Sequence, residues 1–324
     1  MQVRSFALPI VVRSRGLLIR EGLLVRGAPV AGPGWREFSP FTDYPPWMDA
    51  RWWRACAEDP ATWPARHRDR IPVAINVPAV TPDVARTLVA AGLGCTTAKV
   101  RVGTGEVRDV ARVEAVRDAL GPDGLIRVAV NGSWGRDEAV AMLRRLSGYG
   151  LEFAEQPCGS LEDCAYVRRR TGVAIALDES IRLAAGGPEL DRIRDHADIA
   201  VLKVHPLGGV RAALAVAERV GLPAVVSSAL ETSVGIRAGL ALAATLPELP
   251  YACALNTASM FDRDVITPPD VVDGAVQLSE VDDDEALIEA PALSPERERW
   301  WRRRLERAAA VLDDRPTSST AGHP

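Results

Sequence analysis

Two lysines stand in apolar runs where an ammonium group is costly to bury. Lys203 lies in the middle of residues 201–204, and Lys99 lies in residues 97–102. In an extended strand, alternation puts Lys99 and Arg101 on the same face. Basic side chains at the end of a buried strand suit proton transfer and the stabilisation of negative charge on a substrate. The plainer alternative for Lys203 is an ion pair with a buried carboxylate.

Two further apolar runs lie between these lysines, and each ends in an acid. Glu155 closes one run and Asp178 closes the next. On neighbouring strands both carboxylates would point to one spot, which suits a hard divalent cation such as Mg²⁺. For Glu152 and Glu179 a helix cap or a surface ion pair is the favoured interpretation. A lysine on each side of a metal-bound carboxylate suits proton removal next to a substrate carboxylate, and burial is expected to lower the pKa of the lysine.

Composition narrows the possible partners. The 324 residues carry a net charge of -4, from 39 basic and 43 acidic side chains, which argues against nucleic acid. The 5 cysteines are scattered without metal-type spacing, and no apolar run is long enough to span a membrane. We therefore expect a cytoplasmic, monomeric protein that binds a small carboxylate, with no nucleic-acid or membrane partner.

The pattern of apolar and polar residues changes near residue 71. Residues 1–70 contain strand-like runs that predict a hairpin, and Trp52 and Trp53 suit a packed helix. Apolar runs then alternate with helical stretches, which predicts βαβ units. The apolar runs are 72–77, 97–102, 125–130, 151–154, 173–177, 199–204, 223–227 and 251–255.

Eight such runs are the number that closes an α/β barrel with its site at the carboxyl ends of the strands. An open doubly wound sheet is the alternative, but no Gly-x-Gly-x-x-Gly follows an early strand. We expect three segments. Residues 1–70 would form most of an α+β capping domain and residues 71–265 the barrel. Residues 266–324 would be a C-terminal segment that packs on the capping domain or is disordered at its end.

Several motifs, taken in order, resemble one family. They are Trp35 to Phe41, Thr97 to Arg101, Val130 to Trp134, Glu155-Gln156-Pro157, Leu177 to Ser180, Leu202-Lys203, Pro206 to Gly209, and Ser227 to Ser233. Together they resemble the o-succinylbenzoate synthases of menaquinone biosynthesis in the enolase superfamily, and above all their actinobacterial branch. The resemblance implies an Mg²⁺-dependent lyase. Its reaction would be syn-dehydration of 2-succinyl-6-hydroxy-2,4-cyclohexadiene-1-carboxylate to o-succinylbenzoate.

The resemblance also implies roles for individual residues. Lys203 would face the reacting ring and steady the enediolate, and Lys99 is similar to the first lysine of the family's Lys-x-Lys pair. Glu155 and Asp178 would be metal ligands. The substrate-binding residues would be Ser227, Ser228, Gly208, Gly209 and Phe38, the last in a mobile capping loop.

Two positions depart from the family pattern. Arg101 stands where the family has its catalytic lysine, and an arginine stays protonated and cannot act as a general base. Ala129 stands where the family has the first metal-binding aspartate, and a methyl group cannot bind a cation. Loss of the base alone costs on the order of 10²–10⁴ in rate. The sequence therefore predicts a family member whose activity is strongly reduced by these two residues.

Three interpretations of these departures stay open. The first is an engineered knockout, made to trap a ligand. The second is a natural non-enzymatic descendant that binds small molecules, and the third is an active variant. In the active variant Lys99 would be the base, and Asn131 or Glu179 would complete the metal shell. Because fold does not fix function, N-acylamino-acid racemase or cycloisomerase activity on the same scaffold is a further alternative.

Overall fold

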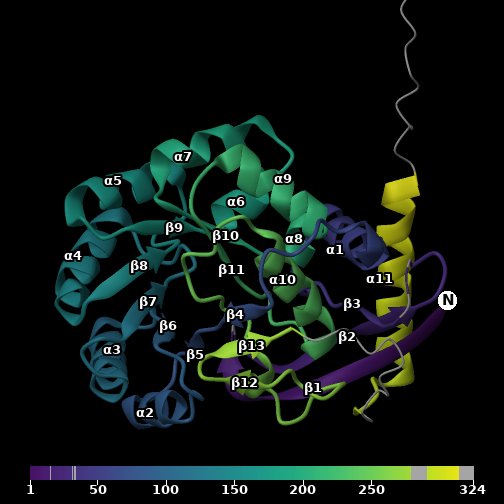
Figure 1. Ribbon diagram of the computed structural model, residues 1–324, viewed down its shortest axis with the longest axis horizontal. Helices are drawn as coiled ribbons and strands as arrows, with labels where there is room; N and C mark the ends of the chain where they lie inside the picture. Colours follow the sequence, from purple (N-terminus) through teal and green to yellow (C-terminus); the bar gives the residue numbers. More distant parts are fainter. Residues whose placement is uncertain (15, 31, 33, 279–289, 314–324) are drawn as a thin grey trace, which may run out of the picture.

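A computed structural model describes residues 1–14, 16–30, 32, 34–278 and 290–313. It consists of a curled parallel sheet ringed by helices, with an antiparallel sheet and two long helices packed at one side (Figure 1). Within the described residues no helix is long and apolar enough to cross a membrane.

Parallel strands line the barrel in the order β11-β10-β9-β8-β7-β6-β5. Their bounds are β5 Ile75–Val77, β6 Thr97–Arg101, β7 Leu125–Ala129, β8 Leu151–Glu155, β9 Ile175–Leu177, β10 Ile199–Leu202 and β11 Ala224–Val226. The eighth predicted run joins the two edges through isolated bridges, with Ala254 beside Ser227 and Cys253 beside Val73. The barrel class predicted from the sequence is confirmed, with bridges at the last position in place of a regular strand.

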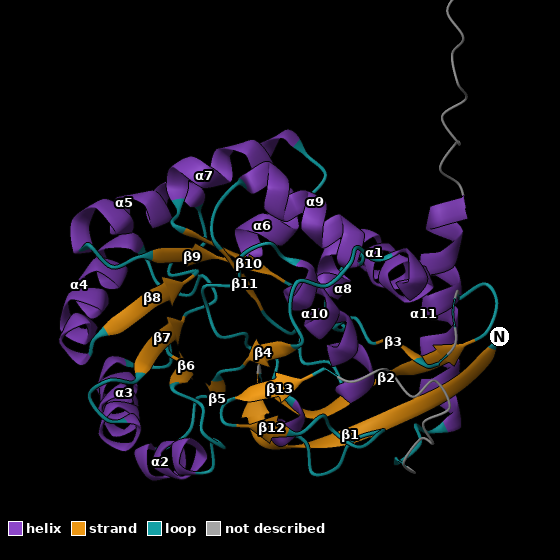
Figure 2. Ribbon diagram, in the orientation of Figure 1, coloured by secondary structure: helices purple, strands orange, loops and turns teal. Residues whose placement is uncertain are grey.

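Helices cover the outer face of the barrel (Figure 2). They are α2 Pro82–Ala90, α3 Glu106–Leu120, α4 Arg136–Leu146, α5 Leu161–Thr171, α6 Glu179–Ala184, α7 Ile193–His196, α8 Val204–Leu207, α9 Val210–Val220 and α10 Ser233–Thr245. Short 3-10 turns lie at Pro60–Thr62, Ser147–Tyr149, Pro188–Arg192 and Ala258–Met260. Because helices cover the strands outside and side chains fill the barrel inside, the strands are mostly apolar, as the hydrophobic runs predicted, apart from the charged residues that line the interior.

The antiparallel part forms a cap beside the barrel. Its strands are β1 Gln2–Ser14, β2 Leu17–Arg26 and β3 Arg36–Phe38, followed by α1 Pro46–Ala57. The C-terminal helix α11, Pro295–Asp313, lies alongside α1 (Figure 1). Arg304 holds it there through paired bonds of 2.6 and 2.7 Å to the buried carboxylate of Asp49. A third small sheet pairs β12 Val271–Val272 and β13 Ala275–Gln277 with β4 Arg70–Pro72.

Candidate active site

Lys99 and Glu155 meet at the carboxyl ends of β6 and β8. Lys99 Nζ lies 2.7 and 2.6 Å from the two carboxylate oxygens of Glu155 and 3.5 Å from Ser227 Oγ. The Lys99 side chain is 15% exposed, whereas that of Glu155 is 4% exposed. The ammonium group therefore reaches the barrel mouth while its partner carboxylate is enclosed.

Lys203 and Asp178 form the matching pair on the other side of the mouth. Lys203 Nζ lies 2.7 Å from Asp178 Oδ2, and the guanidinium of Arg182 lies 3.9 Å from Oδ1. Burial raises the pKa of Asp178, but the positive charges of Lys203 and Arg182 outweigh burial and hold the pKa below its usual value. The carboxylate is thus ionised and held between two cations.

The expectation that burial lowers the pKa of Lys203 is wrong. Burial does act in that direction, but the charges of Asp178, Glu155 and Glu179 act more strongly, so the pKa lies above its usual value. Lys203 is a permanent cation in this arrangement. It suits the stabilisation of negative charge and not the removal of a proton.

Arg101, Ala129 and Glu155 lie side by side in the sheet. Arg101 pairs in register with Ala129, and Ala129 pairs with Glu155. The two departures from the family pattern therefore fall beside the predicted metal ligand, in one row across three strands. The Ala129 methyl leaves no oxygen in the middle of that row.

Glu179 brings a third carboxylate to this end of the barrel. Its Oε1 accepts bonds from Asn131 Nδ2 at 2.9 Å and from Arg182 at 3.2 Å. Its Oε2 is buried and has no hydrogen-bond partner among the described residues. An unsatisfied buried carboxylate oxygen is one that a hard cation would satisfy, so these side chains fit Mg²⁺. Within the described part of the chain, however, no three acidic, His or Cys side chains are gathered closely enough to hold a metal by themselves.

The predicted substrate-side residues fall into two groups. Ser227 reaches Lys99, and Ser228 follows it at the same strand end. Gly208 and Gly209 lie instead against α1, where a Cβ would come within 2.2 Å of Arg54 and 2.7 Å of Glu58. Both glycines have a positive φ, 96° and 118°.

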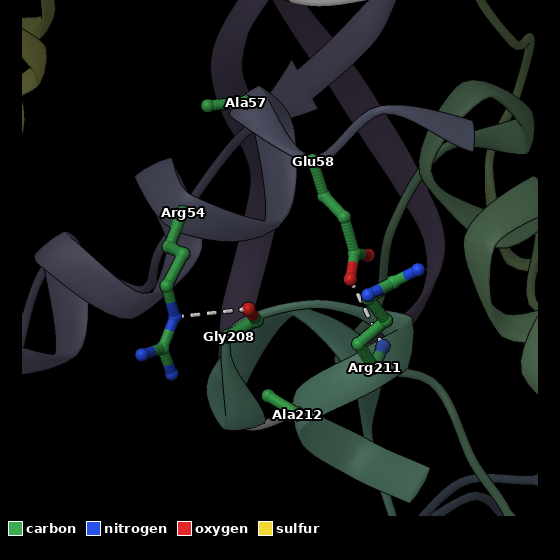
Figure 3. Close-up of a pocket in the computed structure, with 6 residues that line it drawn as sticks. All are labelled: Arg54, Ala57, Glu58, Gly208, Arg211 and Ala212. Carbon is green, nitrogen blue, oxygen red and sulfur yellow. Dashed lines mark hydrogen bonds between the residues drawn. The ribbon is translucent and has the colours of Figure 1, made fainter. Parts of the chain in front are cut away.

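This turn borders a shallow pocket between the cap and the start of α9 (Figure 3). Glu58 accepts bonds from the backbone N–H groups of Val210 and Arg211 at 2.6 and 2.9 Å, and Arg54 donates to Gly208 O at 3.1 Å. The carboxylate thereby caps the helix start, where a negative charge is favourable. The two glycines therefore allow the cap and the barrel to come into close contact.

The placement of Phe38 in a mobile loop is wrong. Phe38 ends β3, is fully buried, and packs edge-to-face on Trp301 of α11 with 6.3 Å between ring centroids. Its side chain contributes to the core of the cap, and its contact with substrate stays a prediction.

Arg182 is a residue of the site that the sequence analysis missed. It follows Asp178 by four residues, and α6 turns its guanidinium back toward Asp178 and Glu179. The i, i+4 spacing was the signal that could have found it. From the cap, the Tyr44 ring lies 5.3 Å from this guanidinium, so Arg182 also connects the cap to the barrel mouth.

Comparison with protein families divides the chain in the same way as the fold. Residues 5–60 match the family described as Enolase N-terminal domain-like, and residues 81–282 match Enolase C-terminal domain-like. An o-succinylbenzoate synthase of Thermobifida fusca is 52% identical over 97% of this chain and 98% of its own length. Another from Mycolicibacterium smegmatis is 44% identical over 91% of both chains.

Solved structures agree with the architecture. A muconate lactonizing enzyme from Pseudomonas fluorescens, complexed with muconolactone, has a TM-score of 0.72 at 21% identity and covers 93% of this chain and 97% of its own. An L-Ala-D/L-Glu epimerase from Bacillus subtilis has a TM-score of 0.72 at 20% identity, covering 86% of this chain and 95% of its own. At these identities the likeness shows the fold alone.

Proposed function

Because the chain belongs to the o-succinylbenzoate synthase family of the enolase superfamily, we propose that it dehydrates 2-succinyl-6-hydroxy-2,4-cyclohexadiene-1-carboxylate to o-succinylbenzoate. The observation that carries the proposal is the pair of ammonium–carboxylate contacts at the barrel mouth, Lys99 with Glu155 and Lys203 with Asp178. They provide a base, a fixed cation and two metal-binding carboxylates around one opening.

Glu155 and Asp178 would hold Mg²⁺, with the unsatisfied Oε2 of Glu179 beside them. The metal, when bound, supplies positive charge to the substrate carboxylate. Lys203 stays protonated and stabilises the negative charge that develops on the reacting ring.

Lys99 is the proposed base. It accepts the proton from the carbon next to the substrate carboxylate, the ring C–O bond breaks, and the proton leaves with the hydroxide as water. Only a neutral amine can accept that proton, so Lys99 must first lose a proton to solvent and separate from the Glu155 carboxylate. Arg101 cannot take over this step, because a guanidinium stays protonated.

The proposed activity is therefore slow. Arg101 replaces the family's base and Ala129 removes a metal ligand, and each loss falls in the same row of the sheet as Glu155. The loss of a general base accounts for on the order of 10²–10⁴ in rate.

A second candidate is binding without turnover. The cations Lys99, Arg101, Lys203 and Arg182 outnumber the carboxylates Glu155, Asp178 and Glu179 at this end of the barrel, so no excess of negative charge there requires a metal. Such a site could hold a dicarboxylate through its lysines alone.

Parallel assays of the unaltered chain separate these functions. We expect slow, Mg²⁺-dependent formation of o-succinylbenzoate and no faster racemisation of N-succinylamino acids. Binding of o-succinylbenzoate that is unaffected by Mg²⁺, with no turnover at high enzyme concentration, would favour the binder. Faster racemisation than dehydration would overturn the assignment.

A further inference from the structure

Gln156 is the residue that follows Glu155, and its backbone is in an unfavourable conformation. Its φ is 42°, in the left-handed region, which is unfavourable for a residue other than glycine. The side chain is nevertheless a buried amide, 1% exposed. A glycine would fit this backbone more easily, so the position points to a use for the amide.

The amide of Gln156 spans the gap between the ends of β8 and β9. Its Oε1 accepts the backbone N–H of Asp178 at 3.2 Å and that of Ser180 at 3.1 Å. Its Nε2 donates to Ser180 Oγ at 2.8 Å and to Cys158 O at 2.9 Å. Both lone pairs and both protons of the amide are used, so its orientation is fixed.

The backbone of Gln156 adds contacts on both sides. Its N–H donates to Ala176 O at 2.8 Å, and its carbonyl accepts from Gly132 N at 2.7 Å. The residue therefore connects the ends of β7, β8 and β9. Those ends carry Ala129, Glu155 and Asp178.

We infer that Gln156 is a positioning residue that fixes the separation and direction of the Glu155 and Asp178 carboxylates. The two strands are staggered: Glu155 pairs in register with Ala176, so Asp178 lies beyond the last paired residue of β9. The strand ladder does not hold the Asp178 peptide at that point, and the Gln156 amide does. The inference rests on the proposed function for the identity of the bound cation.

Removal of the amide would leave the N–H groups of Asp178 and Ser180 without this buried acceptor. Asp178 would keep the bond from Arg182 N to its carbonyl at 3.1 Å, but it would lose the bond that fixes its N–H relative to β8. Groups that orient metal ligands typically contribute about 10–100-fold to metal affinity. A purely structural role would instead lower stability and leave metal affinity unchanged.

Calorimetric titration with Mg²⁺ tests the inference, with Gln156→Met as the main variant because methionine has a similar length and no hydrogen-bonding amide. We expect affinity to fall by about 10–100-fold. Ser180→Ala removes one of the two bonds that Nε2 donates and leaves the one to Cys158 O, so we expect about a threefold loss. Asp49→Asn is the control, because it breaks a buried ion pair with Arg304 in the cap, away from the strand ends.

All variants are titrated in the unaltered chain and in the Ala129→Asp chain, and the unfolding temperature is measured for each. Unchanged affinity in both Gln156→Met and Ser180→Ala would overturn the inference and leave the proposed function standing. An affinity loss in Asp49→Asn equal to that in Gln156→Met would also overturn it. Absence of Mg²⁺ binding in both parent chains would overturn the metal assignment itself, and with it the role given to Gln156.

Discussion

The barrel interior holds ion pairs at two levels, and the two levels differ in what encloses them. Arg127 lies on β7 two residues before Ala129 and pairs with Glu152. Its guanidinium lies over the rings of Phe153 and Tyr251, 4.7 and 5.7 Å from their centroids, and the Arg127 side chain is 1% exposed. In the lower pair the cation is the enclosed partner, covered by aromatic rings and bonded to Ala252 O, whereas the Glu152 side chain is 14% exposed.

The upper level is open. Lys99 and Lys203 are 15% and 14% exposed at their side chains, although their partner carboxylates are almost fully buried. Basic and acidic side chains thus form one structural ion pair at the lower level and two accessible ion pairs at the upper level. Partial exposure of the cation, with a buried carboxylate behind it, distinguishes a site for a ligand from an ion pair that only supports the fold.

The largest effect is expected at Lys203. In a chain whose activity has been restored at positions 101 and 129, Lys203→Ala should lower turnover by on the order of 10²–10³, because the fixed cation is lost. Steady-state kinetics and binding of o-succinylbenzoate measure this. If Lys203→Ala had normal turnover and normal product binding, Lys203 would have only a structural role, like that of Arg127.

Glu155→Gln should weaken Mg²⁺ binding by more than about a hundredfold, since it removes a charged ligand and not merely a group that orients one. Circular dichroism should show an intact fold, because the residue lies at the end of its strand. Metal affinity equal to that of the unaltered chain would contradict the assignment.

Arg127→Met should lower stability and leave activity unchanged, the reverse of the effects expected at Lys203 and Glu155. We expect the free energy of unfolding to fall by about 3 kcal/mol, because Glu152 loses its buried partner, while the activity per folded molecule is unchanged. Arg145→Met is the matched control, since its ion pair with Glu106 is about half exposed and should contribute less than about 1 kcal/mol. If urea denaturation gave the same loss of unfolding free energy in both variants, enclosure by the rings would not strengthen the Arg127–Glu152 pair.

A smaller, pH-dependent effect is expected at Asp109, which accepts bonds from Gly103 N, Thr104 and Arg112 behind the end of β6. Burial raises its pKa, but these hydrogen bonds outweigh burial and hold the pKa below its usual value. Its stabilising contribution is therefore present at neutral pH and lost as pH falls through the lowered pKa. Asp109→Asn should cost about 1–3 kcal/mol at pH 7 and progressively less in acid. A difference in unfolding free energy that does not change with pH would contradict this.

The sequence predicted the barrel well, because the positions of its strands depend on local spacing. Apolar runs located the strands, and alternation put Lys99 on the inner face of β6. The sequence did not predict which lysine pairs with which carboxylate. It also missed the raised pKa of Lys203, since that shift depends on charges from two other segments of the chain, at Glu155 and at Asp178–Glu179.

Contacts between the cap and the barrel were the least predictable part. The Gly208–Gly209 turn suggested a substrate contact, but about 150 residues separate it from its actual neighbours on α1. Phe38 likewise was expected in a mobile capping loop, although it lies in β3 and packs on α11. Such contacts depend on how distant elements dock, which no local pattern specifies.

Reversion of both departures tests the central claim most directly. Arg101→Lys with Ala129→Asp returns a base and a metal ligand to one row of the sheet, next to Glu155. We predict that the double variant forms o-succinylbenzoate faster than the unaltered chain by about 10³-fold or more, whereas each single reversion restores much less, because both groups act on one transition state. Full dehydratase activity in the unaltered chain, or no gain in the double variant, would contradict the account.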